Sequence, residues 1–189
     1  QLGWVWVYTE GRYLGNIGKS RIHGLEGMAV VNVNPELNVT FNISYKDTEI
    51  LADKRANLVG KNLAGSSAGD FQYSFLADWA RRINDFDVRV NATYRHVPER
   101  VSGYSDLNGQ TPIPSYDTMD LSIGVGRDAW EVALNVHNLF DERGYTHQPV
   151  GGGVWPNPNG NANWLDRFAL YDVIRPRTVG LELTYNFGN

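Results

Sequence analysis

Strict alternation of apolar and polar residues over long segments is the feature of this sequence that most restricts its fold. The clearest case is the segment from Thr178 to Phe187, where every second side chain is apolar or aromatic. These side chains are Val179, Leu181, Leu183, Tyr185 and Phe187. Because successive side chains of a β-strand point to opposite faces, the pattern predicts a strand with one apolar and one polar face.

The same period-two pattern recurs along the chain and predicts an all-β fold with about eight strands. Five segments alternate clearly: 37–46, 88–95, 119–126, 130–137 and 178–187. Three are less regular: 4–8, 19–33 and 71–82. Segments 37–46 and 178–187 have the roughly 9–11 residues that a tilted membrane strand needs, whereas soluble strands are mostly shorter.

The connections between these predicted strands alternate between short and long. The short ones carry good turn residues: Asn34-Pro35-Glu36, Asn84-Asp85-Phe86 and Arg127-Asp128-Ala129. The long ones cover residues 47–68, 98–115 and 141–171. This arrangement is typical of an antiparallel transmembrane β-barrel with short periplasmic turns and long extracellular loops. The apolar face would then meet lipid, and the polar face would line the lumen.

Composition excludes several other classes of protein. A net charge of −4 gives no basis for binding nucleic acid. The chain has no cysteine, so it has no disulfide, thiolate metal site or cysteine nucleophile. The four histidines, His23, His96, His137 and His147, lack metal-ligand spacing, and no Gly-x-Ser-x-Gly elbow occurs. We therefore predict no catalysis, cofactor or metal; an outer-membrane hydrolase is the enzymatic alternative.

Four motifs occur in order along the chain: NIGKSRIHGLE (16–26), TPIPSYDTMDLSIGV (111–125), WEVALNVHNLFDERGY (130–145) and RPRTVGLELTYNF (175–187). Together they resemble the C-terminal barrel region of TonB-dependent outer-membrane receptors. The resemblance implies that residues 1–189 are the C-terminal portion of such a barrel in a Gram-negative cell outer membrane. The plug domain, the TonB box and the N-terminal strands would be missing from this segment, which could not transport by itself.

The resemblance also implies a function and a set of partners. The complete receptor would take up a scarce ligand, such as a ferric siderophore, a vitamin or an oligosaccharide. Its partners would be the small-molecule ligand, outer-membrane lipid and lipopolysaccharide, the barrel assembly machinery, and the TonB complex acting through the plug. The apolar run of segment 178–187 resembles the outer-membrane assembly signal. The alternatives are a complete small eight-stranded outer-membrane barrel with a structural or adhesion role, and a soluble β-sandwich binding module.

The long loops are the predicted places for ligand contact. The candidates are Tyr145, His147, Trp155 and Trp164 in segment 141–171, and Arg55 and Lys61 in segment 47–68. Loop aromatics can stack against a sugar ring or a catechol, and the two basic residues could meet an anionic ligand or lipopolysaccharide phosphates. Alternatively, these aromatics pack on each other or anchor at the membrane interface, and the charges are solvated.

Overall fold

A computed structural model describes residues 3–7, 11–15, 18–53, 58–63, 65–67, 69–101, 112–147 and 172–187. Its strands are β1 (Gly3–Val7), β2 (Gly11–Gly15), β3 (Gly18–Asn34), β4 (Leu37–Asp53), β5 (Phe71–Ile83), β6 (Phe86–Val97), β7 (Arg100–Val101), β8 (Pro112–Ile113), β9 (Tyr116–Arg127), β10 (Trp130–His137), β11 (Tyr145–His147), β12 (Asp172–Val173) and β13 (Thr178–Tyr185). Within these ranges, no helix is long and apolar enough to cross a membrane.

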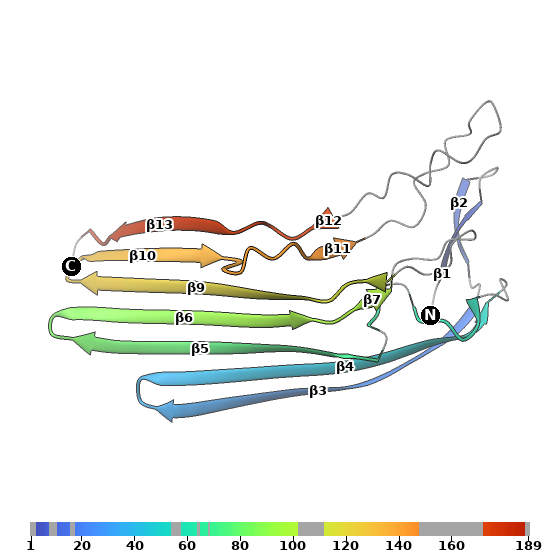
Figure 1. Ribbon diagram of the computed structural model, residues 1–189, viewed down its shortest axis with the longest axis horizontal. Coiled ribbons are helices and arrows are strands. Elements are labelled where there is room, and N and C mark those ends of the chain that lie inside the picture. Colours follow the sequence, from blue (N-terminus) through green and yellow to red (C-terminus); the bar gives the residue numbers. More distant parts are fainter. Residues whose placement is uncertain are drawn as a thin grey trace.

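Seven of these strands form one antiparallel sheet in the order β13-β10-β9-β6-β5-β4-β3. The hairpin turns β3–β4, β5–β6 and β9–β10 all lie at one end of the sheet, on the left of Figure 1. The long connections leave from the opposite end, where β7, β11 and β12 are found. We call these the turn end and the loop end. The predicted all-β antiparallel topology, with sorted connections, is confirmed.

Each turn at the turn end is built by residues suited to it. Asn84 and Asp128 open two-residue hairpin turns with φ of 54° and 52°, in the left-handed region that Asn and Asp tolerate better than most residues. In the third turn, the backbone N–H of Glu36 donates to Asn34 Oδ1 at 2.8 Å. The tight reversals that the sequence predicted therefore have a local chemical cause.

Strand β4 extends further toward the loop end than the predicted segment 37–46, whereas β3 matches the predicted segment 19–33 to within one residue at each end. Each has 17 residues, and the pairing continues beyond Tyr45 to Asp53. In this extension polar pairs replace apolar pairs on the same face: His23 Nε2 lies 3.4 Å from Asp47, and Arg21 Nη2 lies 2.6 Å from Glu49. The apolar pattern ends there, but the hydrogen-bonded ladder does not.

The first predicted strand, 4–8, does not belong to the large sheet. It corresponds to β1, which pairs with β2 in a separate antiparallel hairpin, with Gly3 opposite Gly15 and Val7 opposite Gly11. In the described ranges the large sheet therefore has two open edges, formed by β3 and β13. The pairing between first and last strands that would close a small eight-stranded barrel is not found there.

The apolar face of the large sheet is not covered by other described parts of the chain. Leu25 is 77% exposed and Leu181 is 75% exposed, although both lie in the middle of long strands. The buried apolar side chains lie elsewhere, at or beyond the loop end: Ile50, Leu58, Val97, Pro98 and Ile113. A soluble β-sandwich would bury this face against a second sheet. The described sheet is instead a single wall with an exposed apolar surface.

Candidate functional site

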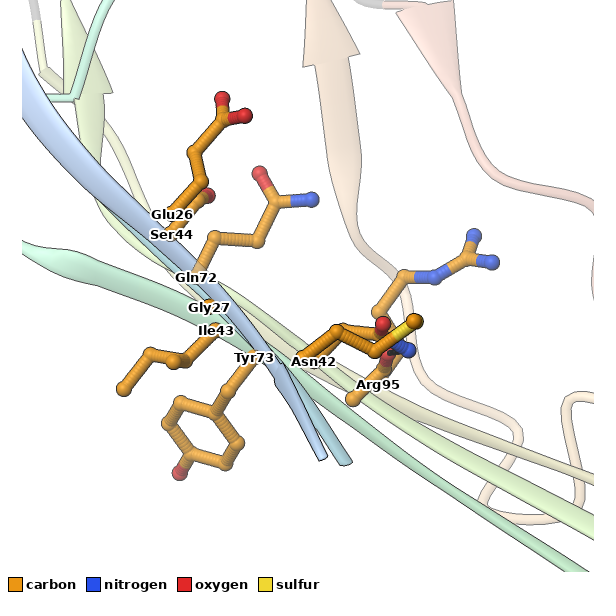
Figure 2. Close-up of a pocket in the computed structure, with 10 residues that line it drawn as sticks. Glu26, Gly27, Asn42, Ile43, Ser44, Gln72, Tyr73 and Arg95 are labelled. Carbon is orange, nitrogen blue, oxygen red and sulfur yellow. Dashed lines mark hydrogen bonds between the residues drawn. The ribbon is translucent and has the colours of Figure 1, made fainter. Parts of the chain in front are cut away.

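The strand register sorts the side chains of the large sheet into two faces. The polar face includes Glu26, Asn42, Ser44, Gln72, Ser74, Asp78, Arg89, Asn91, Arg95, Asp120, Ser122, Glu131, Asn135 and Glu182. The apolar face includes Phe41, Phe75, Val90, Ile123, Val132, Leu134 and Leu181. Figure 2 shows this division directly, because Glu26, Gln72 and Arg95 stand on one side of the sheet and Ile43 and Tyr73 on the other.

A shallow groove of about 420 Å³ runs over the polar face, across β3, β4, β5 and β6. Its lining is Glu26, Gly27, Met28, Asn42, Ile43, Ser44, Gln72, Tyr73, Ser74 and Arg95 (Figure 2). Asn42 Nδ2 donates to Ser74 Oγ at 3.3 Å, which ties two of the strands under the groove. The carboxylate of Glu26 and the guanidinium of Arg95 stand at opposite sides of it (Figure 2). The groove therefore offers charged and neutral polar groups to whatever occupies this side.

Nearer the turn end, polar side chains of the polar face bond to one another. Arg89 Nη2 on β6 donates to Glu131 Oε2 on β10 at 2.8 Å, across the intervening strand β9. Ser122 Oγ donates to Asn135 Oδ1 at 2.7 Å. Gly124 lies under this ion pair, where an added Cβ would be 3.4 Å from Glu131 Oε1, about van der Waals contact. This part of the face is organised to sit beside water or another polar surface.

Breaking the Arg89–Glu131 ion pair is expected to have a small effect. The two side chains are 54% and 33% exposed, so water competes for both charges and salt screens them. We expect Arg89→Met to lower the free energy of unfolding by less than about 1 kcal/mol, measured by urea titration in lipid vesicles. A loss several times larger would mean that the pair is enclosed rather than water-facing.

The Asn138-Leu139-Phe140-Asp141 segment forms a corner that joins the ends of three strands. The Asn138 side chain is 5% exposed; its Nδ2 donates to the carbonyl oxygens of Glu142 and Arg175 at 2.9 and 3.0 Å, and its Oδ1 accepts from Glu142 N–H at 3.0 Å. Its own N–H donates to Asp120 Oδ1 at 2.9 Å. Asp141 Oδ1 accepts from the N–H of Arg177 at 3.0 Å. The corner thus holds the start of β13 against β9 and β10.

Aromatic side chains border the apolar face at the loop end. Tyr45 lies against Phe71 with ring centroids 5.1 Å apart, and Tyr73 packs near Tyr94 at 6.3 Å. Just beyond them the polar groups begin: Asp117 Oδ1 accepts from Tyr94 Oη at 2.7 Å and lies 2.7 Å from His96 Nδ1. The apolar band therefore ends sharply in rings that carry hydroxyl groups.

A second aromatic border lies at the turn end. Trp130 and Tyr185 have ring centroids 4.5 Å apart, and Phe187 meets Tyr185 edge-on at 4.5 Å. The Arg127 guanidinium lies over Phe86, with its carbon 5.4 Å from the ring centroid. Two aromatic borders around an exposed apolar band match the girdles that flank the lipid-facing surface of outer-membrane barrels.

The comparisons with known proteins agree with this geometry. The family model described as "TonB dependent receptor-like, beta-barrel" matches residues 5–139. The chain belongs to the TonB-dependent receptor barrel family. A solved structure, the ferric yersiniabactin uptake receptor FyuA from Yersinia pestis, is similar with a TM-score of 0.69 at 20% sequence identity. The alignment covers 93% of this chain and 25% of that receptor. No curated protein matches the sequence.

For this TonB-dependent receptor segment, the predicted ligand-binding residues fall into two groups. Trp155, Trp164 and Arg55 lie outside the described residues. Tyr145 and His147 belong to the short strand β11 at the loop end, and the side chain of Tyr145 is half-buried. Lys61 is exposed at the same end, in the segment that follows β4. Of the predicted assembly residues, Val179, Leu181, Leu183 and Tyr185 lie on the exposed apolar face of β13, and Phe187 lies just beyond the strand.

The structure brings together residues that the sequence did not identify as a group. The groove residues lie on four strands and are brought together by the register. For Glu26, Gln72 and Arg95 the linear pattern predicts a place on the polar face but not that they line one groove. The guanidinium of Arg100 has no local signal in the sequence, because the two carbonyl groups to which it donates are 45 and 46 positions away. No group of three or more metal-ligating side chains gathers in the described portion of the receptor segment.

Proposed function

We propose that this chain forms part of the wall of an outer-membrane barrel that takes up a scarce ligand by TonB-dependent transport. The observation that carries the proposal is the sheet itself, with an exposed apolar face between two aromatic borders and a charged polar face opposite. The apolar face meets lipid and lipopolysaccharide, and the polar face lines the lumen. We assign residues 1–189 to the C-terminal portion of a larger barrel; in the described ranges β3 and β13 are open edges, which supports a barrel with further strands.

The polar groove and the loop-end residues are the parts that we assign to the ligand and to the plug. Transport would require the plug domain and the TonB complex acting on it, so the segment alone is not transport-competent. Tyr145, His147, Trp155 and Trp164 supply rings for stacking, and Arg55 and Lys61 supply positive charge. The apolar residues of segment 178–187 act as the signal for the barrel assembly machinery. A ferric siderophore is the first ligand class to test, because FyuA takes up one.

The test is energised uptake by the complete receptor that contains this segment. The receptor is produced in a Gram-negative strain that lacks its own siderophore and cobalamin receptors, and the probes are radiolabelled ferric yersiniabactin, ferric enterobactin and cyanocobalamin and a labelled maltooligosaccharide. We expect at least one probe to accumulate, and only in cells with an intact TonB complex. Equal accumulation with and without that complex, or no accumulation of any probe by a surface-assembled receptor, would contradict the proposal.

A further inference from the structure

Three segments of the chain that are far apart in sequence meet at the loop end through Arg100. Its Nη2 donates to the carbonyl oxygen of Tyr145 at 2.8 Å, and its Nη1 donates to that of Thr146 at 3.4 Å. Its backbone lies in β7, which pairs with β8. Because the guanidinium is a planar fork with several fixed donors, it can hold two neighbouring carbonyl groups in one orientation, which a lysine ammonium cannot do in the same way.

The surroundings of Arg100 are closely packed. Its guanidinium carbon lies 5.9 Å from the ring centroid of Tyr116, within cation–π range. Gly144 lies against the same Tyr116 ring, since a Cβ added at position 144 would lie 2.5 Å from Tyr116 Cγ. Glycine is therefore needed at position 144 so that the backbone of segment 144–146 can approach the ring. Val97, Pro98 and Ile113 beside this contact are buried.

The same strand also fixes the segment that follows β4. Gly65 N–H donates to the carbonyl oxygen of Val101 at 2.8 Å, and Val101 N–H donates to that of Ser66 at 3.1 Å. Segment 58–63 is held in turn to β4, since Lys61 O accepts from Ile50 N–H at 2.9 Å and Gly60 N–H donates to Ile50 O at 2.9 Å. Leu58 of this segment and Ile50 of β4 are both buried, at 2% and 5% exposed. These contacts give the loop end a small apolar core of its own.

We infer that Arg100 is a positioning residue that fixes segment 144–146 against segments 58–63, 65–67 and 97–101 as one preformed rim. The rim carries Lys61 and Tyr145, two of the residues assigned to ligand contact, so its functional meaning rests on the proposed function. A surface already fixed before binding loses less conformational freedom when a ligand arrives, which raises affinity. Arg100 Nε is buried and makes no hydrogen bond among the described residues, so the contacts of the guanidinium are made through Nη1 and Nη2.

The test measures how firmly the rim is held, without any ligand. Spin labels are placed on cysteines introduced at Lys61 and Thr146 of the complete receptor, free of other cysteines, and the distance distribution between them is recorded by double electron–electron resonance. Both positions are exposed, and the 189 residues contain no native cysteine. We expect one narrow distribution in the parent and a clearly broader one in both Arg100→Met and Arg100→Lys.

The matched control is Arg143→Met. Arg143 is an exposed arginine next to Gly144, and among the described residues it makes none of the contacts made by Arg100. Its replacement removes the same charge immediately next to the rim and should leave the distribution narrow. Heat-modifiable mobility on gels shows that each variant is folded. If the Arg100 variants do not assemble, Gly144→Ala is measured, because its methyl group must push segment 144–146 off Tyr116 and should broaden the distribution too.

Uptake kinetics separate this inference from the proposed function. For whichever of the four probes is taken up, we expect Arg100→Met to raise the half-saturating concentration about tenfold, with little change in maximal rate. An unchanged narrow distribution in Arg100→Met, or in Gly144→Ala where that variant replaces it, would overturn the inference even if uptake proceeds. A broadened distribution together with no TonB-dependent uptake of any probe would instead uphold the rim and contradict the proposed function.

Discussion

Replacing Val90 by arginine is expected to remove most of the folded receptor from the outer membrane. Val90 is at the centre of the apolar run of β6, which extends from Phe86 to Tyr94, and its neighbours on β5 and β9 are Trp79 and Ile123. If this face meets lipid, an arginine there lies near the bilayer midplane, where it destabilises a barrel by about 2–4 kcal/mol. The measurement is the amount of heat-modifiable receptor in the outer-membrane fraction, followed by urea unfolding in lipid vesicles.

The adjacent residue provides the control. Asn91 lies on the opposite face, where it pairs across the strands with Asp78 and Ser122. Asn91→Arg places the same side chain one position away, on the polar face and close to a carboxylate, and should lower the level of assembled receptor only slightly. Equal losses for the two substitutions would mean that the two faces meet the same environment, which contradicts a lipid-facing wall.

Most of the large sheet could be predicted from the sequence because one of its faces is apolar and the other is polar. A strand between lipid and an aqueous lumen must alternate, and the alternation alone identifies both the strand and its faces. Even the apolar exceptions on the polar face do not change the register. Leu76 sits opposite Thr40 and Thr93, where the pairing of the neighbouring strands leaves it no other face.

The parts that the sequence did not predict lie beyond the region where one face of the sheet is apolar and the other polar. Beyond Tyr45 the outer surface of β3 and β4 carries ion pairs such as Arg21–Glu49, so the apolar signal stops while backbone pairing continues to Asp53. Strand β4 was therefore predicted too short. At the loop end, the contacts of Arg100 depend on which connections are brought together by the finished sheet, and no local propensity encodes that.

The Asn-Leu-Phe-Asp corner could be predicted in part from the sequence. Its residue types could be recognised as a motif and as the end of a strand, and the structure confirms that β10 stops at His137. Its role depends on Arg175 and Arg177, more than 30 residues later, whose backbone groups bond to Asn138 and Asp141. A short polar motif is thus the attachment point for the last strand of the sheet.

Removing the side chain of Asn138 is therefore expected to loosen β13. Asn138→Gly keeps a residue that accepts the φ of 50° but deletes the three part-buried hydrogen bonds that the side chain makes to Glu142 and Arg175. At about 1 kcal/mol for each of the three bonds, we expect the free energy of unfolding to fall by about 3 kcal/mol. Urea titration of the complete receptor in lipid vesicles measures this loss.

Two further variants show which property of Asn138 matters. Asn138→Asp retains the acceptor for Glu142 N–H but cannot donate to the carbonyl of Arg175, so it should lose most of the same stability. Asn91→Gly, at an exposed position on the polar face of β6, controls for the added backbone freedom of glycine, which alone should account for about 1 kcal/mol. If Asn138→Gly is no less stable than Asn91→Gly, the hydrogen bonds of the corner do not hold β13 in place, and the strand is retained by its pairing with β10 alone.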